Sequence, residues 1–238
     1  MKLLHLALLI VLASLNLTAQ ATLGDELNLT ETDDTIRITL RGKPVLQYIK
    51  KPQPVPEGLP QHFSRSGYIH PVYTPTGQEI TGDYPADHAH QHALFFGWVK
   101  TKFDGKNVDF WNQAKGLGRI EFREVLNRSR EEQSVSFSVQ HAFMVKEGEK
   151  WIDALHEVWT VTVHQTPADH FLFDLVSVQQ CASDKTLSLQ EYHYGGMAIR
   201  GNSQWLKEKG DLSIHSGDAQ YLTSDGKDRW EGNHSRPN

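Results

Sequence analysis

The chain has 238 residues, 13 of which are histidine, a formal charge of −5 at pH 7 and a single cysteine, Cys181. This length suits one large domain or two small ones, and one cysteine cannot form a disulfide within the chain. The mild acidity argues against nucleic acid or an anionic membrane as a partner. We therefore expect a fold that depends on its apolar core or on a metal.

The first 21 residues read MKLLHLALLIVLASLNLTAQA, a lysine followed by an apolar run and a small-x-small ending. This is the layout of a secretory signal peptide. The run is short for a membrane span of about 20 residues, and no cysteine follows it for lipid attachment. The sequence predicts an exported protein, periplasmic or extracellular, that is not a lipoprotein. Its single domain covers residues 22–238, with no later membrane-spanning segment.

Alternation of apolar and polar residues dominates the chain after the signal peptide. Runs with this period of two occur at residues 36–40, 120–122, 135–139 and 159–163, between clusters of Gly, Asn, Asp and Lys. Such runs are typical of antiparallel sheet with one buried face, and helical periodicity is scarce. The sequence therefore predicts a mostly-β, antiparallel β-sandwich.

The region between residues 51 and 88 departs from this pattern. Residues 51–60, KPQPVPEGLP, hold four prolines and cannot join a central strand. Residues 62–88 are rich in turn-forming residues, which predicts a long irregular stretch. Loops of this length are often functional, because a rigid scaffold can present them over a site.

Residues 82–98, GDYPADHAHQHALFFGW, place histidines at every second position: His88, His90 and His92. If the strand that contains Leu94 begins as early as His88, all three imidazoles share its apolar face and point into the sandwich. Converging imidazoles can bind zinc or copper, or transfer protons near neutral pH. The segment is therefore a candidate metal site with these three ligands.

A second interpretation of the same segment stays open. Pro85 and Asp87 favour a strand that starts only near Gln91, which leaves His88 in the loop. Histidines at the mouth of a strand commonly bond to backbone carbonyl groups and stiffen a loop.

The segment TLSLQEYHYGGMAIRG supplies a candidate acid and base. Leu187, Leu189, Glu191 and His193 share one strand parity, so an apolar row leads into a carboxylate and an imidazole. Burial raises the pKa of a carboxyl group and a cation lowers it, which is how sites tune acids and bases. We predict Glu191, His193 and His88 as catalytic residues.

Glu157 is a third unusual carboxylate. In WIDALHEVWTVTV it has the parity of Leu155, Trp159 and Val161, so it is predicted to face the core. A buried charge needs a partner. The alternative is that a bulge at the start of the strand moves Glu157 to another environment.

The C-terminal segment DGKDRWEGNHSRPN is rich in groups that suit sugars, because aromatic rings stack on sugar rings and polar groups bond to hydroxyls. The alternative is an exposed polar tail. The candidate substrate-binding residues are Arg200, Arg229, Trp230, Asn233 and His234.

Four segments together resemble the PmoA-like family of secreted bacterial proteins, labelled methane oxygenase PmoA. They are YIHPVYTPTGQEITGDYPADHAHQHALFFGW, DFWNQAKGLGRIEF, EYHYGGMAIRG and DRWEGNHSRP. The family's histidine block usually reads Pro-x-Asp-His-Pro-His-His-His-Gly, so Ala89, Gln91 and Ala93 are departures. Family members tend to continue past the last segment, so the resemblance implies that further strands are missing after Asn238.

The resemblance implies a sandwich similar to the galactose-mutarotase-like folds of saccharide-degrading bacteria. We therefore predict a carbohydrate-active enzyme, a hydrolase, lyase or epimerase, that acts on a small saccharide or glycoside with His/Glu acid-base chemistry. Two alternatives stay open. One is a metal-dependent oxidoreductase or hydrolase with zinc or copper as cofactor, and the other is a saccharide-binding protein without catalysis. The sequence leaves the oligomeric state open.

Overall fold

The computed structural model describes residues 26–85, 88–205 and 226, and the predicted signal peptide lies outside them. This part of the chain is mostly strand, and its named strands pair antiparallel, which confirms the predicted fold class. No helix in it is long and apolar enough to span a membrane. The elements are β1 (Leu27–Glu31), β2 (Thr35–Leu40), β3 (Lys43–Ile49), η2 (Gln61–Phe63), β4 (Tyr68–Val72), β5 (Leu94–Gly97), β6 (Thr101–Phe103), β7 (Lys106–Val108), β8 (Gly118–Arg130), β9 (Ser134–Glu147), β10 (Lys150–His164), β11 (Leu172–Cys181), β12 (Leu187–Leu189), β13 (Gly196–Ile199) and η3 (Ser203–Trp205).

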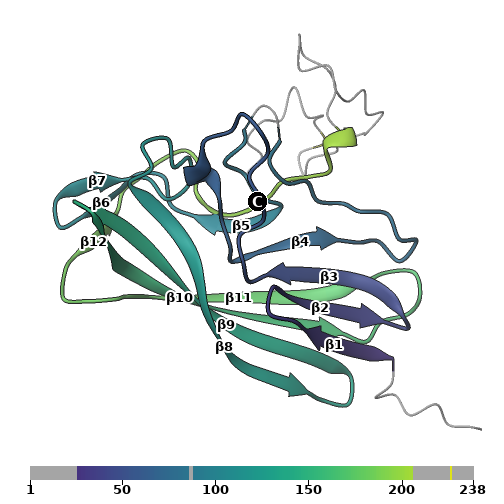
Figure 1. Ribbon diagram of the computed structural model, residues 1–238. Helices are drawn as coiled ribbons and strands as arrows, with labels where there is room; N and C mark the ends of the chain where they lie inside the picture. The colour runs from purple at the N-terminus through teal and green to yellow at the C-terminus, as the bar shows by residue number, and fades with distance from the viewer. Residues whose placement is uncertain (1–25, 86–87, 206–225, 227–238) are drawn as a thin grey trace, which may run out of the picture.

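Two sheets form the body of the fold, and a third small sheet lies at one end (Figure 1). The six-stranded sheet has the order β1-β2-β3-β4-β5-β13, and the four-stranded sheet has the order β11-β10-β9-β8. The three-stranded sheet, β12-β6-β7, packs its buried Phe103 and Val108 against Ile120 and Phe143 of the four-stranded sheet. Loops from several strands gather at this end of the sandwich.

The predicted alternating runs supply the core between the two large sheets. Ile36 and Ile38 of β2 belong to the same buried cluster as Phe137 of β9 and Trp159 and Val161 of β10. All five are at most 1% exposed. Because successive side chains of a strand point to opposite faces, each run buries one face and leaves polar residues on the other.

One strand lies where the sequence predicted an irregular stretch. β4 (Tyr68–Val72) pairs with β3 and joins β5 through Ile69 and Leu94. Its alternation is too short to stand out, since Pro71 interrupts it and Gly67 precedes it. The proline-rich residues 51–60 contain no strand, as expected.

The predicted core-facing position of Glu157 is confirmed, since the residue is fully buried in β10. Its Oε2 lies 3.0 Å from His141 Nδ1, and its Oε1 accepts hydrogen bonds from Ser177 Oγ (2.6 Å) and Gln179 Nε2 (2.8 Å). Burial by itself raises the pKa of Glu157, but these hydrogen bonds hold it below its usual value. Glu157 is therefore a buried anion.

His141 connects this anion to the opposite sheet. Its Nε2 lies 2.6 Å from the hydroxyl of Tyr48 on β3. A neutral ring that donates from Nδ1 to Glu157 and accepts from Tyr48 satisfies both partners. Burial lowers the pKa of His141, in agreement with a neutral ring.

Arg65 supplies the compensating positive charge. The residue is 1% exposed, its Nη2 donates to the carbonyl of Phe96 at 2.6 Å, and its guanidinium lies 5.1 Å from the ring centre of Phe95. Burial lowers its pKa to about 10, and the charge of Glu157 opposes this shift, so Arg65 is a cation at neutral pH.

We expect Glu157→Gln to lower the free energy of unfolding by about 1 to 3 kcal/mol, the usual cost of leaving a buried polar group without a partner. The amide removes the negative charge that Arg65 compensates. It also replaces one acceptor oxygen with an NH2 donor, which faces groups that themselves donate. Urea unfolding at pH 7 measures the effect. The control is Glu124→Gln, an exposed residue of β8, which we expect to change stability by at most about 0.5 kcal/mol. Equal losses in the two variants would contradict the prediction.

Candidate functional site

The histidines at residues 88–92 do not continue strand β5. The strand begins at Leu94, and residues 88–91 form a turn closed by a 2.8 Å hydrogen bond from the Gln91 amide to the His88 carbonyl. Ala93 has a φ of 41°, in the left-handed region, which breaks the extended backbone between His92 and Leu94. The prediction that the three imidazoles share a strand face was wrong, and the alternative with a later strand start fits.

His92 fills a structural role in this loop. Its ring is buried, with Nδ1 2.7 Å from Asp83 Oδ1 and Nε2 3.1 Å from the carbonyl of Phe63. Asp83 also accepts a 2.8 Å hydrogen bond from the hydroxyl of Tyr68. Both nitrogens of His92 therefore have hydrogen-bond partners within the protein.

His88 and His90 lie together in the turn, with ring centres 5.7 Å apart. His90 is partly buried, and its Nε2 is buried without a hydrogen-bond partner among the described residues. Burial, with a further contribution from His88, lowers the pKa of His90 to about 4. Within the described ranges no three His, Cys, Asp or Glu residues are grouped to hold a metal. The described residues therefore give no support to the zinc or copper site predicted at His88, His90 and His92.

The predicted acid and base, Glu191 and His193, are exposed, so their expected core-facing parity was wrong. The reason is that β12 ends at Leu189, after three residues paired with β6. Glu191 and His193 lie in the loop that follows, which ends at the positive-φ residues Gly195 and Gly196. A row of aromatic rings occupies this loop.

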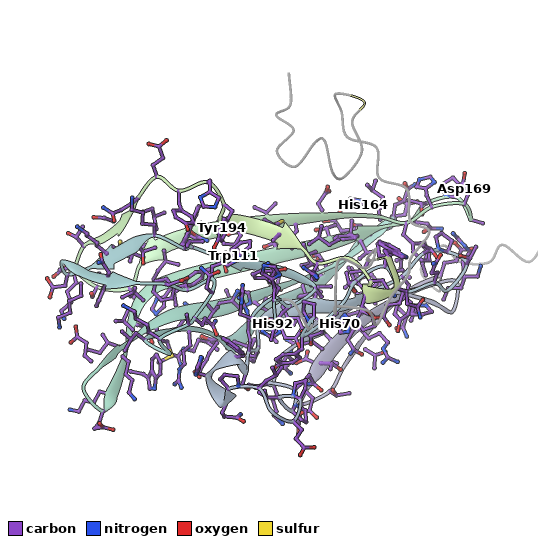
Figure 2. All side chains as sticks on the ribbon, turned by 90° about the horizontal axis from the view of Figure 1, so that it is seen from above. His70, His92, Trp111, His164, Asp169 and Tyr194 are labelled. Carbon is purple, nitrogen blue, oxygen red and sulfur yellow. The ribbon has the colours of Figure 1, made fainter. Side chains whose placement is uncertain are left out.

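The ring of His193 lies 4.2 Å from that of Tyr192 and 4.7 Å from that of Tyr194. Tyr194 in turn packs against Trp111, with ring centres 5.5 Å apart (Figure 2). Its hydroxyl donates a 3.0 Å hydrogen bond to Asn112 Oδ1. The loop at residues 190–195, the aromatic loop, is therefore anchored to the turn that contains Trp111 and Asn112.

Asp109 organises that turn. It was not among the residues predicted to be functional from the sequence. Its carboxylate accepts three hydrogen bonds of 2.8 Å, from the amides of Trp111 and Asn112 and from Asn112 Nδ2. The signal was the order Asp-x-x-Asn in DFWN, since Asp side chains commonly bond to the backbone two or three residues later. The charge of Asp109 also acts on the pKa of His90, which it raises, so the carboxylate lies near the histidine turn at residues 88–91.

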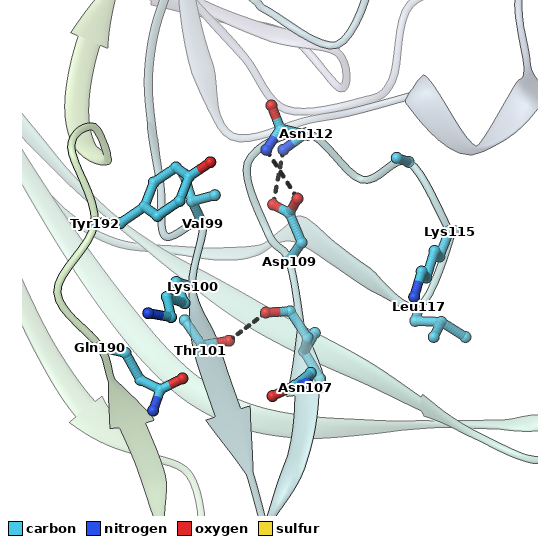
Figure 3. A pocket seen from close by; sticks show the side chains of 12 residues that line it. Val99, Lys100, Thr101, Asn107, Asp109, Asn112, Lys115, Leu117, Gln190 and Tyr192 are labelled. Atoms are coloured by element: carbon cyan, nitrogen blue, oxygen red, sulfur yellow. Dashed lines mark hydrogen bonds between the residues drawn. The ribbon is translucent and has the colours of Figure 1, made fainter.

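A cavity of about 360 Å³ opens beside this turn (Figure 3). It lies between β6, β7, the loop at residues 109–117 and the start of the aromatic loop. Amide, ammonium and hydroxyl groups share its wall with a tyrosine ring and aliphatic side chains. Its lining residues are Val99, Lys100, Thr101, Asn107, Val108, Asp109, Asn112, Ala114, Lys115, Leu117, Gln190 and Tyr192.

The predicted substrate-binding residues do not line this cavity. Arg200 follows β13 and donates a 3.1 Å hydrogen bond from Nη1 to Gln91 Oε1, and its backbone amide donates to the Ala93 carbonyl at 2.6 Å. Arg200 therefore ties the histidine turn to β13. The other candidates lie outside the described residues: Arg229, Trp230, Asn233 and His234.

A family model described as a family of unknown function, DUF6807, matches residues 35–237 of the chain. The chain belongs to this family. The DUF6807 description names no activity, so the resemblance to PmoA-like proteins stays a prediction. No curated protein and no solved structure matches the chain.

We expect the ring of His90 to titrate with a pKa of about 4, well below the value of about 6.5 for an unperturbed histidine. The reason is that burial disfavours the imidazolium. NMR of the ring resonances between pH 3 and 8 measures the midpoint, and the signal lost in His90→Gln gives the assignment. A midpoint above pH 6 would contradict the burial of this side chain.

Proposed function

We propose that this DUF6807 member binds a small saccharide or glycoside in the cavity beside Asp109. The observation that carries the proposal is the lining of the cavity, which combines directed polar groups with an aromatic ring. A volume of about 360 Å³ falls at the small end of the usual range for ligand sites, roughly 300 to 1,000 Å³. The predicted signal peptide supports a role after export.

The polar lining suits hydroxyl groups. Each sugar hydroxyl can donate and accept a hydrogen bond, and the amides of Asn107, Asn112 and Gln190 offer both functions in one side chain. Tyr192 adds a half-exposed ring at the same wall, which can stack on the apolar face of a sugar. The two contact types together favour a ring-shaped, hydroxyl-rich ligand.

The positions of the predicted catalytic residues favour binding over turnover. Gln190 and Tyr192 line the cavity, whereas Glu191 and His193 do not. The one carboxylate of the lining, Asp109, already accepts three hydrogen bonds within its turn. A saccharide-binding protein therefore fits the cavity better than an enzyme that needs two free carboxyl groups there.

Catalysis is a second candidate, and one observation favours it. His90 has a buried, unpartnered Nε2 among the described residues and a pKa lowered to about 4, so its ring is neutral at pH 7. A neutral imidazole with a free nitrogen can accept a proton. Glu191 lies in the loop after β12 and His88 in the turn that also holds His90, so these predicted catalytic residues are the candidates to act with His90 in a hydrolase, lyase or epimerase.

We expect at least one monosaccharide or short glycoside to raise the melting temperature of the purified protein, and Tyr192→Ala to weaken its binding about tenfold. A stacked ring contributes up to about 1.5 kcal/mol beyond its buried area, and about 1.4 kcal/mol corresponds to a tenfold change in affinity. Isothermal titration calorimetry measures the affinity. The matched control is Leu189→Ala, an exposed residue of β12 that does not line the cavity.

Two results would count against saccharide binding: no ligand of a broad panel stabilises the protein, or Tyr192→Ala binds as tightly as the wild type. Product analysis by chromatography after long incubation separates the two candidates. A product that disappears in His90→Gln supports the enzyme, and stable binding without product supports the binding protein.

A further inference from the structure

We propose that the ligand of the cavity carries a carboxylate, so that the protein selects acidic sugars such as uronic acids over their neutral counterparts. This inference rests on the proposed saccharide-binding function. Its basis is the charge of the cavity wall, which the hydroxyl-binding groups do not explain.

Two lysines line the cavity from different elements. Lys100 precedes β6, and Lys115 lies in the loop at residues 109–117. In Figure 3 their side chains flank Asp109. Within the described residues neither ammonium group has an ion-pair or hydrogen-bond partner, although other lysines at this end do. Lys106 and Lys185 both lie within 4 Å of the carboxylate of Glu147.

Asp109 is the one acidic residue among those that line the cavity, and it does not neutralise this pair. Its two oxygens already accept hydrogen bonds from Trp111 and Asn112. Two ammonium groups against one carboxylate leave the wall with a net positive charge. An anion entering here exchanges its hydration for charge-assisted hydrogen bonds, which are about twice as strong as neutral ones.

The remaining lining limits what kind of anion fits. A site for a bare inorganic anion needs only positive groups, whereas this cavity also presents three amides and the ring of Tyr192. A sulfate or acetate ion would leave the acceptor oxygens of these amides and the ring of Tyr192 unused. A carboxylate attached to a hydroxylated ring uses both sets of groups at once, and a uronic acid is the simplest ligand of that class.

The test compares sugars that differ only at carbon 6: galacturonate with galactose, and glucuronate with glucose. We expect calorimetry at low salt to show that a uronate binds at least tenfold more tightly than its neutral partner. The preference should shrink as sodium chloride rises from 20 to 500 mM, since salt screens exposed charges. Sodium acetate and sodium sulfate are titrated in parallel as anions without a sugar ring.

Lys100→Gln and Lys115→Gln should each reduce uronate affinity about ten- to hundredfold, the range for a hydrogen bond to a charged group. Both variants should reduce neutral-sugar affinity less, so that the ratio of the two affinities falls. Lys102→Gln is the matched control: Lys102 is an exposed lysine of β6 that does not line the cavity, and the substitution removes the same charge. Circular dichroism confirms that the variants fold.

The outcomes separate this inference from the function on which it rests. Equal binding of neutral and acidic sugars overturns the acidic preference and leaves saccharide binding intact. Sulfate or acetate bound as tightly as a uronate overturns it in favour of a general anion site. Equal losses in Lys102→Gln and the two cavity variants overturn it as well. Absence of any sugar binding overturns both proposals.

Discussion

The fold is constrained by one buried negative charge, the carboxylate of Glu157 between the two large sheets. A charge in this position is tolerated only when its surroundings supply hydrogen bonds and a counter-charge. His141 joins it to Tyr48 of the opposite sheet, and Arg65 balances its charge. Gln179, which donates to Glu157, also accepts from the indole of Trp98. The same set of bonds thus fixes β5 and the chain that leads from it into β6, where the cavity begins.

The sequence predicted the parts of the fold in which alternation is long and uninterrupted. Strands β9 and β10 are 14 and 15 residues long, and each buries one face. The predicted core-facing position of Glu157 was correct for this reason. Alternation failed as a guide where the backbone changes conformation between neighbours. The left-handed Ala93 separates His92 from β5, and the early end of β12 leaves Glu191 and His193 in a loop.

Most residues of the candidate site could not be predicted from the sequence, because they come from segments with no shared pattern. Tyr194 and Asn112 are 82 positions apart, yet they are joined by a hydrogen bond that holds two loops together. Lys100 and Lys115 stand out only when their place beside one cavity is known. The histidine cluster could be identified from the sequence because its members are neighbours in one short segment. Its most buried member, His92, holds the loop in place through Asp83 and Phe63.

The turn at Asp109 also bears on how quickly a ligand can be recognised. Its three internal hydrogen bonds use only groups of the chain itself, and Tyr194 braces the turn from the neighbouring loop. A binding wall that is already ordered loses little conformational entropy on association. Complex formation then needs no slow rearrangement of the chain, so the lifetime of the complex, more than its rate of formation, should distinguish one ligand from another.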